Sequence, residues 1–88
     1  MYWDVIEVKI EKTREFRVKF NDGLSGLIVI ESSFCSGVFK ALLDDDLVRQ
    51  ARADNGVVTW PNGLDLAPDT MYNEIRKNPE HRYVLRGN

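Results

Sequence analysis

The first thirty residues alternate between apolar and polar side chains, and this pattern predicts β-strands. Ile6, Val8 and Ile10 alternate with charged residues, with the period of two that is typical of a strand with one buried face. Residues 16–20 repeat the pattern after a polar break. The pair Asp22-Gly23 follows and favours a tight hairpin turn in which both residues have positive φ.

The next segment, residues 24–30, is apolar on both faces apart from Ser25 and Gly26. Such a run predicts a more central strand with little solvent on either side. Gly26 indicates a bulge or a close approach of another part of the backbone. Together with the two preceding segments, this strand predicts an N-terminal antiparallel β-meander.

After Glu31 the apolar spacing changes to three and four residues, which predicts one face of a short helix. The apolar positions of this face are Phe34, Val38, Phe39, Leu42 and Leu43. The run 44–46 contains three aspartates and separates this helix from a second one over about residues 47–51. An aspartate at that point accepts hydrogen bonds from the free amides of the second helix.

The second half of the chain predicts a hairpin, a turn and a last helix. The turn signal at 54–56 joins residues 51–53 to a short strand at 57–60, and Pro61-Asn62-Gly63 ends that strand in a turn. A helix begins near Pro68 and ends at Asn78, because the residue before a proline avoids the α region. Residues 80–88 form either a docked strand or a frayed end.

Length and composition limit the architecture to a single small domain. The 88 residues are 43% hydrophobic and 30% charged, as in a soluble chain with one core. We therefore predict an α+β fold: an N-terminal antiparallel meander, two short helices, a second short hairpin and a C-terminal helix packed on the sheet. Residues 1–76 form the domain and residues 77–88 a short C-terminal tail. Without a membrane-length apolar run or a secretory leader, we expect a cytoplasmic protein.

Charge is unevenly distributed along the chain. The net charge is −2, but residues 44–69 hold six aspartates against two arginines, and residues 70–88 hold four basic against two acidic groups. A surface that binds duplex nucleic acid has a strong basic excess, so we expect no direct nucleic-acid binding and no membrane association. The acidic stretch favours a small basic protein as partner, and a second copy of the chain is the other candidate partner.

The segment 60–69 contains the candidate site: Trp60, Pro61, Asn62, Gly63, Asp65 and Asp69. Asp65 and Asp69 lie four residues apart near Trp60, an arrangement that would suit acid–base or metal chemistry over a pocket. The alternative is structural: Asp65 bonds the backbone of the turn and Asp69 lies at the N-terminus of the last helix. Turns are built from these residue types, which favours the structural interpretation.

The remaining reactive residues do not form a recognisable catalytic or metal set. The three aspartates at 44–46 lack the ligand spacing of a calcium loop. Cys35 has no cysteine partner and its one candidate base, His81, is distant in sequence, so we expect a buried thiol and a surface imidazole. We predict no cofactor, no metal and no catalytic residue.

The segment Val57–Tyr72 resembles the closing motif of the small bacterial family catalogued as domain of unknown function 2442 (DUF2442). The resemblance covers about residues 3–75 and also includes Val18–Gly23, Gly37–Phe39, Leu42-Leu43 and Asp44. It implies an α+β domain with an N-terminal antiparallel sheet and implies no established chemistry. Relatives are joined to a helix-turn-helix domain or encoded beside a second small protein, as in toxin–antitoxin pairs. No helix-turn-helix pattern follows residue 75 here.

Two hypotheses about function result. The first is a non-catalytic interaction or regulatory module, in its narrower form the antitoxin-like partner of a small protein encoded nearby. An uncovered edge of the N-terminal sheet would be its docking site, because unpaired backbone groups accept another strand. The second is a small enzyme or ligand-binding protein with a pocket near Trp60, Asp65 and Asp69.

Overall fold

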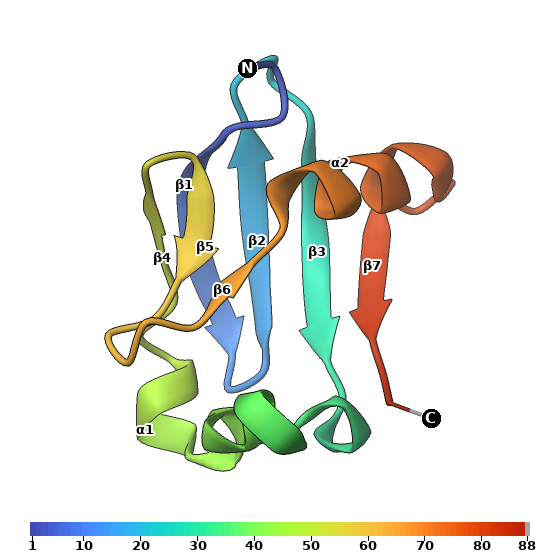
Figure 1. Ribbon diagram of the computed structural model, residues 1–88. Coiled ribbons are helices and arrows are strands. Elements are labelled where there is room, and N and C mark those ends of the chain that lie inside the picture. The colour runs from blue at the N-terminus through green and yellow to red at the C-terminus, as the bar shows by residue number, and fades with distance from the viewer. Residues whose placement is uncertain (88) are drawn as a thin grey trace.

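The computed structural model describes residues 1–87 and has two β-sheets, one long helix and three short ones (Figure 1). The strands are β1 (Val5–Lys12), β2 (Glu15–Phe20), β3 (Ser25–Ile30), β4 (Arg52–Asp54), β5 (Val57–Thr59), β6 (Asp65–Leu66) and β7 (Arg82–Leu85). The helices are the 3₁₀ helices η1 (Ser32–Phe34) and η2 (Gly37–Leu43), and the α-helices α1 (Asp45–Val48) and α2 (Pro68–Lys77). The predicted α+β class is confirmed.

Sheet A has the strand order β1-β2-β3-β7, and sheet B has the order β4-β5-β6. The first three strands of sheet A are antiparallel neighbours, which confirms the predicted meander. The last strand, β7, pairs with β3 in parallel, with Ile28 beside Tyr83 and Ile30 beside Leu85. The predicted inner position of β3 in the sheet is therefore confirmed, and residues 82–85 of the C-terminal segment are a docked strand. The prediction of little solvent on either side of β3 is wrong for one face, where Leu27 and Val29 are only half-buried.

The apolar alternation of β1 is interrupted by an irregularity in the pairing with β2. The register shifts between Val5 and Glu7, so that Ile6 is the additional residue on this strand. Val5 is buried and Ile6 is 53% exposed, whereas Val8 and Ile10 pack against the core. The prediction that Ile6 belongs to the buried face is wrong, because a one-residue bulge reverses the alternation on one side of it.

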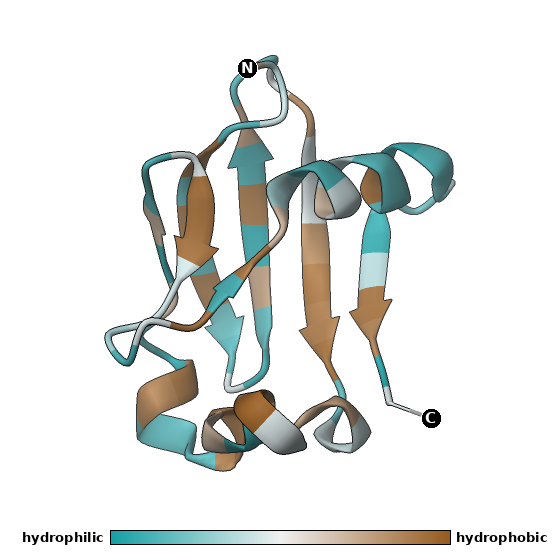
Figure 2. Cartoon of the chain, viewed as in Figure 1, coloured by the Kyte–Doolittle hydropathy of each residue, from teal (hydrophilic) through white to brown (hydrophobic). Residues whose placement is uncertain are grey.

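Every covering layer lies on the same face of sheet A. Helix α2 and sheet B pack in front of this face, and η1, η2 and α1 close its lower end (Figure 1). The apolar runs of β3 and β5 lie on either side of the interior (Figure 2). The largest fully buried side chains of this core are Trp60, Phe16, Phe20, Ile28, Leu42, Met71 and Ile75.

At Gly26, Ile75 of α2 and the backbone of His81 approach β3 closely. A Cβ atom there would lie 2.6 Å from Cγ2 of Ile75 and 2.7 Å from the carbonyl oxygen of His81. The same carbonyl accepts a hydrogen bond of 2.9 Å from the amide of Leu27, which begins the pairing of β3 with β7. The close backbone approach predicted for Gly26 is confirmed.

The segment after β3 is helical, but in the 3₁₀ form over most of its length. Leu42 is buried, whereas Val38 is 73% and Leu43 44% exposed. The predicted apolar face is therefore wrong for Val38 and Leu43, because a 3₁₀ helix repeats every three residues and does not align apolar positions spaced four apart, whereas Phe34 and Phe39 pack against the core as predicted. The predicted cap is confirmed: Oδ1 of Asp44 accepts hydrogen bonds from the amides of Asp46 and Leu47.

Candidate functional site

The segment Trp60–Leu64 is a turn that joins β5 to β6. The amide of Trp60 donates to the carbonyl of Leu64 (2.9 Å), and the amide of Gly63 donates back to the carbonyl of Trp60 (3.0 Å). Oδ1 of Asn62 accepts from the amide of Leu64 (3.2 Å), and Gly63 has a φ of 90°. The asparagine thus bonds within the turn, while the glycine supplies the positive φ.

Trp60 belongs to the core and offers no surface to a ligand. Its side chain is 1% exposed and meets the ring of Phe16 edge-on, with the ring centroids 6.3 Å apart. Its indole Nε1 donates a hydrogen bond of 3.1 Å to the carbonyl oxygen of Val48 in α1. This bond satisfies a buried donor and connects α1 to the turn, so the side chain has a structural role here.

The two aspartates of the candidate site are both exposed and lie on different elements. Asp65 is in β6 opposite Thr59, and Asp69 is in the first turn of α2, where its carboxylate favours the helix N-terminus. Oδ1 of Asp69 also accepts from the amide of Thr70 (2.9 Å). The expected bond of Asp65 to the turn is not present within residues 1–87, because Asn62 makes that bond instead.

Cys35 is buried and His81 is exposed, as the sequence predicts. Burial raises the pKa of the Cys35 thiol, which disfavours the thiolate that a nucleophile requires. The thiol Sγ lies 3.7 Å from the carbonyl oxygen of Glu31, its hydrogen-bond acceptor. Among residues 1–87, no three histidine, cysteine or acidic side chains come together as metal ligands.

A second turn, Phe20–Leu24, has the same set of hydrogen bonds as Trp60–Leu64. The amide of Phe20 donates to the carbonyl of Leu24, the amide of Gly23 donates to the carbonyl of Phe20, and Oδ1 of Asp22 accepts from the amide of Leu24. Gly23 has a φ of 96° and Asp22 does not have a positive φ. The prediction of two positive φ values at Asp22-Gly23 is therefore wrong; Asn55-Gly56, between β4 and β5, has them instead.

Asp22 has a further contact that the sequence did not predict. Its Oδ2 accepts a hydrogen bond of 2.5 Å from the hydroxyl of Tyr72 in α2. This bond lowers the pKa of the Asp22 carboxyl and raises the pKa of the Tyr72 phenol, because it favours the charged carboxylate and the neutral phenol. Tyr72 also packs edge-on against Phe20, and the contacts hold α2 to the β2–β3 turn.

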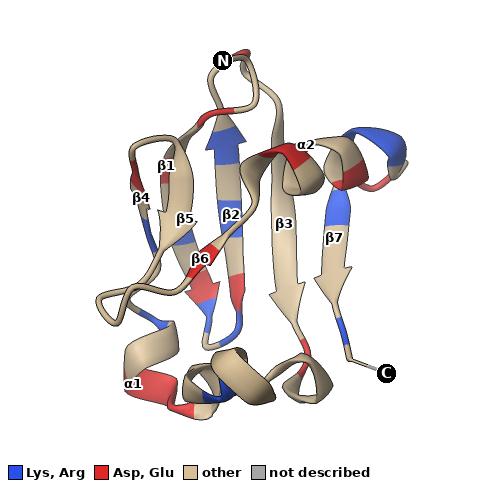
Figure 3. Cartoon of the chain, in the orientation of Figure 1, with Lys and Arg blue, Asp and Glu red and all other residues tan. Residues whose placement is uncertain are grey.

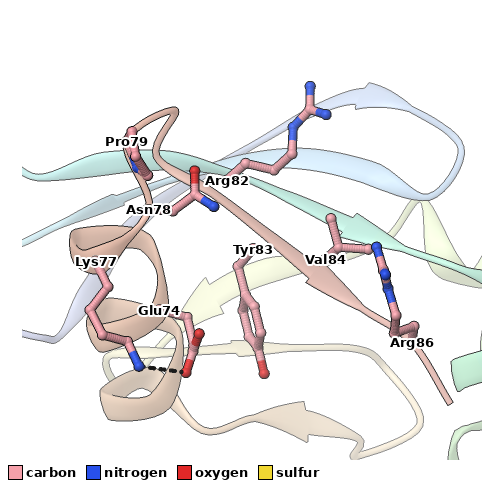
Figure 4. A pocket seen from close by; sticks show the side chains of 8 residues that line it. All are labelled: Glu74, Lys77, Asn78, Pro79, Arg82, Tyr83, Val84 and Arg86. Carbon is pink, nitrogen blue, oxygen red and sulfur yellow. Dashed lines mark hydrogen bonds and ion pairs between the residues drawn. The ribbon is translucent and has the colours of Figure 1, made fainter. Parts of the chain in front are cut away.

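A groove of about 410 Å³ lies between the end of α2 and β7 (Figure 4). Its charged lining residues are Glu74, Lys77, Arg82 and Arg86, and the others are Asn78, Pro79, Tyr83 and Val84. The ring of Tyr83 lies on the same side of β7 as α2, and Arg82 points to the other side (Figure 4). Burial and, to a lesser extent, Glu74 raise the pKa of the Tyr83 phenol.

The cations of this groove are only weakly engaged by acidic side chains. Nζ of Lys77 lies 3.2 Å from Oε1 of Glu74, and a guanidinium nitrogen of Arg86 lies 3.6 Å from Oε2 of Glu31. Lys77 is 70% and Arg86 64% exposed, and Arg82 has no acidic partner within the described chain. Sequence reasoning missed this groove because the parallel pairing of β7 brings these cations together.

The six aspartates of residues 44–69 do not lie on one element. They belong to the α1 region, β4, β6 and the start of α2 (Figure 3). Asp44 caps α1, and Asp45 accepts two hydrogen bonds of 2.8 Å from the guanidinium of Arg14. Asp54 lies 4.0 Å from Arg52. Some of these aspartates are thus engaged in contacts within the domain.

Comparison with known proteins identifies a family and no individual relative. The family described as "Protein of unknown function (DUF2442)" matches residues 5–77, and the chain belongs to it. No curated protein and no solved structure matches the chain. Within residues 1–87, no helix has the length and apolar character needed to cross a membrane.

Proposed function

We propose that this member of the DUF2442 family is a non-catalytic interaction module that binds another protein. The observation that supports the proposal is the second face of sheet A, over which no described element packs (Figure 1). An antiparallel sheet with one solvated face normally carries polar residues there. Here the uncovered face carries apolar residues on β3 and β7 beside charged residues of both signs, and Nε of Arg17 lies 3.1 Å from Oε2 of Glu11. This combination suits a protein partner.

The pairing registers place these residues side by side. Leu27 in β3 has Arg17 of β2 on one side and Arg82 of β7 on the other. In the parallel row, Val29 lies beside Val84. Leu27, Val29 and Val84 are half-buried although no layer covers them. A partner that covers this row would bury apolar surface and meet the cations at its borders.

The two edges of sheet A differ in their availability. β1 is in contact with β4, and the amide of Val5 donates to the carbonyl of Gly56 (2.8 Å). β7 pairs with β3 alone. The edge that supports docking is therefore at the C-terminal strand, because the start of the meander is in contact with sheet B.

In its narrower form, the proposal is an antitoxin-like role in the bacterial cytoplasm beside a small basic protein. Its support is the excess of four negative charges in residues 44–69. Such a contact would weaken with added salt, because exposed charges are screened. A ligand pocket at Trp60, Asp65 and Asp69 has less support, because the indole is buried and the aspartates lie on separate elements.

Affinity capture followed by reconstitution tests the proposal. The tagged protein is used to capture partners from its host, and the captured protein is purified and titrated by calorimetry at low and moderate ionic strength. We expect a stoichiometric complex, weakened at least tenfold by Leu27→Asp. The control is Val38→Asp, because Val38 is an apolar residue at the surface that lies on η2 and away from sheet A.

Two outcomes contradict the proposal. If no protein is retained in stoichiometric amount, the interaction hypothesis loses its support and a ligand screen becomes the next experiment. If Leu27→Asp and Val38→Asp bind the partner equally well, the uncovered face of sheet A is not the docking surface. A dissociation constant that does not change with ionic strength would remove the basic-partner form of the proposal.

A further inference from the structure

We propose that the outer edge of β7 accepts an extended acidic segment of a partner protein as a fifth strand of sheet A. This inference rests on the broader form of the proposed function, a module that binds another protein, and not on its basic-partner form; it names the site and the chemistry of the bound segment. Its four supports are the free backbone of β7, the groove beside it, the cations that line the groove, and the poor fit of a second copy of the chain.

The backbone of β7 has unpaired groups along its outer edge. The carbonyls of His81 and Leu85 accept hydrogen bonds of 2.9 Å from Leu27 and Glu31, so they point toward β3. Along a strand, successive residues direct their amide and carbonyl groups to opposite sides. Arg82 and Val84 therefore direct theirs away from β3, where no strand of the described chain pairs with them.

The groove has the form that a strand-adding segment needs. It lies along this edge, between the last turn of α2 and β7, with Tyr83 and Glu74 on the helix side (Figure 4). Backbone hydrogen bonds to an exposed edge supply affinity, and flanking side chains supply specificity. The segment would thus lie beside β7 with alternate side chains directed toward α2 and toward the outer face of sheet A.

The charge of the groove favours an acidic segment. Three cations, Lys77, Arg82 and Arg86, line it against one carboxylate, Glu74. Blue segments surround this edge at the end of α2, at the start of β7 and after its end (Figure 3). Arg82 has no acidic partner within residues 1–87, so an incoming carboxylate would not have to displace one.

A second copy of the chain that pairs along the whole row from Arg82 to Arg86 fits this edge poorly. In an antiparallel pair of two β7 strands centred on Val84, Arg82 of each copy would lie opposite Arg86 of the other. Like charges directly opposite one another in a sheet are destabilising. The same charges protect the free edge against self-pairing, as charged residues do on many edge strands.

The spacing along β7 predicts the pattern of the bound segment. Side chains two residues apart lie on the same face of a strand, so Arg82, Val84 and Arg86 form one row. The complementary row is an acid, an apolar residue and an acid at positions i, i+2 and i+4. Because this pattern is symmetric, it matches the row on β7 whether the segment runs parallel or antiparallel to the strand.

The experiment is a titration of the purified full chain with synthetic capped peptides, followed by the backbone amide signals in NMR spectra. The probe contains Glu-Thr-Val-Thr-Glu, and the two controls contain Glu-Glu-Val-Thr-Thr and Lys-Thr-Val-Thr-Lys. We expect the probe to shift the amides of Arg82 and Val84 together with those at the end of α2. We expect it to bind about tenfold more tightly than either control.

Two variants test the edge itself. The double variant Arg82→Glu/Arg86→Glu should weaken binding of the probe about tenfold or more, whereas Lys19→Glu on β2 should not weaken it. Val84→Pro removes an outward amide that β3 does not use, so it should abolish binding and preserve the melting transition. If Val84→Pro does not fold, the charge variants still decide the question, because they leave the backbone unchanged.

Four results would overturn the inference. These are no binding of the probe, equal binding of the controls, full affinity in Arg82→Glu/Arg86→Glu, and concentration-dependent self-association that shifts the amides of β7. Binding of the captured partner to wild type and to the double variant distinguishes failure of this inference from failure of the proposed function. A partner that binds wild type and Arg82→Glu/Arg86→Glu equally leaves the interaction module standing and removes the β7 edge as its site.

Discussion

Asn62 and Asp22 occupy the same position in two turns with the same hydrogen bonds. In each turn a side-chain oxygen accepts from the amide two residues later, and a glycine with positive φ follows. Asp22 uses its second oxygen to bind Tyr72, whereas the amide nitrogen of Asn62 has no hydrogen-bond partner in the described part of the chain. The part of the candidate motif around Asn62 is thus a turn unit that the fold uses twice.

Replacing Asn62 should affect stability through this turn. We expect Asn62→Ala to lower the free energy of unfolding by about 1 kcal/mol, because the amide of Leu64 loses its acceptor. Asn62→Asp should be nearly neutral, because Asp22 makes the same bond in the other turn. The control is Asp65→Ala, whose side chain bonds nothing in the turn. Urea unfolding measures all three, and a larger loss for Asp65→Ala than for Asn62→Ala would contradict this account.

The Asp22–Tyr72 bond should make stability depend on pH at both ends of the scale. The pKa of Asp22 is lowered from 3.8 in the folded state, so its contribution is present above that value and is lost as the pH falls through the folded pKa. The pKa of Tyr72 is raised from 10.0, so its contribution is present below that value and is lost as the pH rises through the folded pKa.

Tyr72→Phe tests this dependence. The variant should be less stable than wild type between these limits, and its stability should change less at the acidic and alkaline ends. Urea unfolding over a pH series and the carboxyl carbon signal of Asp22 measure the two effects. Identical pH profiles for Tyr72→Phe and wild type would show that the bond does not form in solution.

Trp60→Phe should destabilise the domain more than Trp3→Phe does. The substitution at Trp60 leaves the carbonyl of Val48 without its donor and removes volume from the core, with an expected loss of about 1–3 kcal/mol. Trp3 is only half-buried, so its replacement should cost less. The comparison is made by thermal and urea unfolding, and an equal loss in the two variants would argue against the structural role of Trp60.

Gly26→Ala should strain the contact between β3 and α2. Its Cβ would meet Cγ2 of Ile75 at 2.6 Å and the carbonyl oxygen of His81 at 2.7 Å, so we expect a loss of about 1–3 kcal/mol. Adding Ile75→Val should restore a small part of the loss, because it removes Cδ1, which would lie 2.9 Å from that Cβ, but leaves Cγ2 and the carbonyl in place. No recovery in the double variant would assign the strain to Cγ2 of Ile75 and the carbonyl of His81.

Ending the chain after Lys77 should test the contribution of β7. The shortened chain retains the family match at 5–77 but loses the strand that pairs with β3 and the buried side chain of Leu85. We expect a loss of about 2–5 kcal/mol from Leu85 alone, and a lower melting temperature. An unchanged melting temperature would show that residues 78–88 are dispensable for the fold.

The sequence alone determined the features that depend on neighbouring residues. The alternation of β2, the Asp44 cap and the helix that begins at Pro68 follow from contacts within a few positions. The hairpins were predictable for the same reason, because a short turn brings adjacent segments together. The bulge at Ile6 and the 3₁₀ form of η2 were not predictable. The hydrophobic pattern is compatible with a regular or a bulged strand and with an α- or a 3₁₀ helix, and packing against the rest of the domain selects between them.

Only the tertiary structure decided which segments far apart in the sequence become neighbours. The parallel pairing of β7 with β3 has no local signal, because a crossover connects the two strands and their register depends on both. That pairing brings Arg82 and Arg86 to the end of α2, and the packing of α2 brings Tyr72 to Asp22. The turn at Asn62 could therefore be predicted from the sequence, whereas the groove at β7 forms only when the chain has folded.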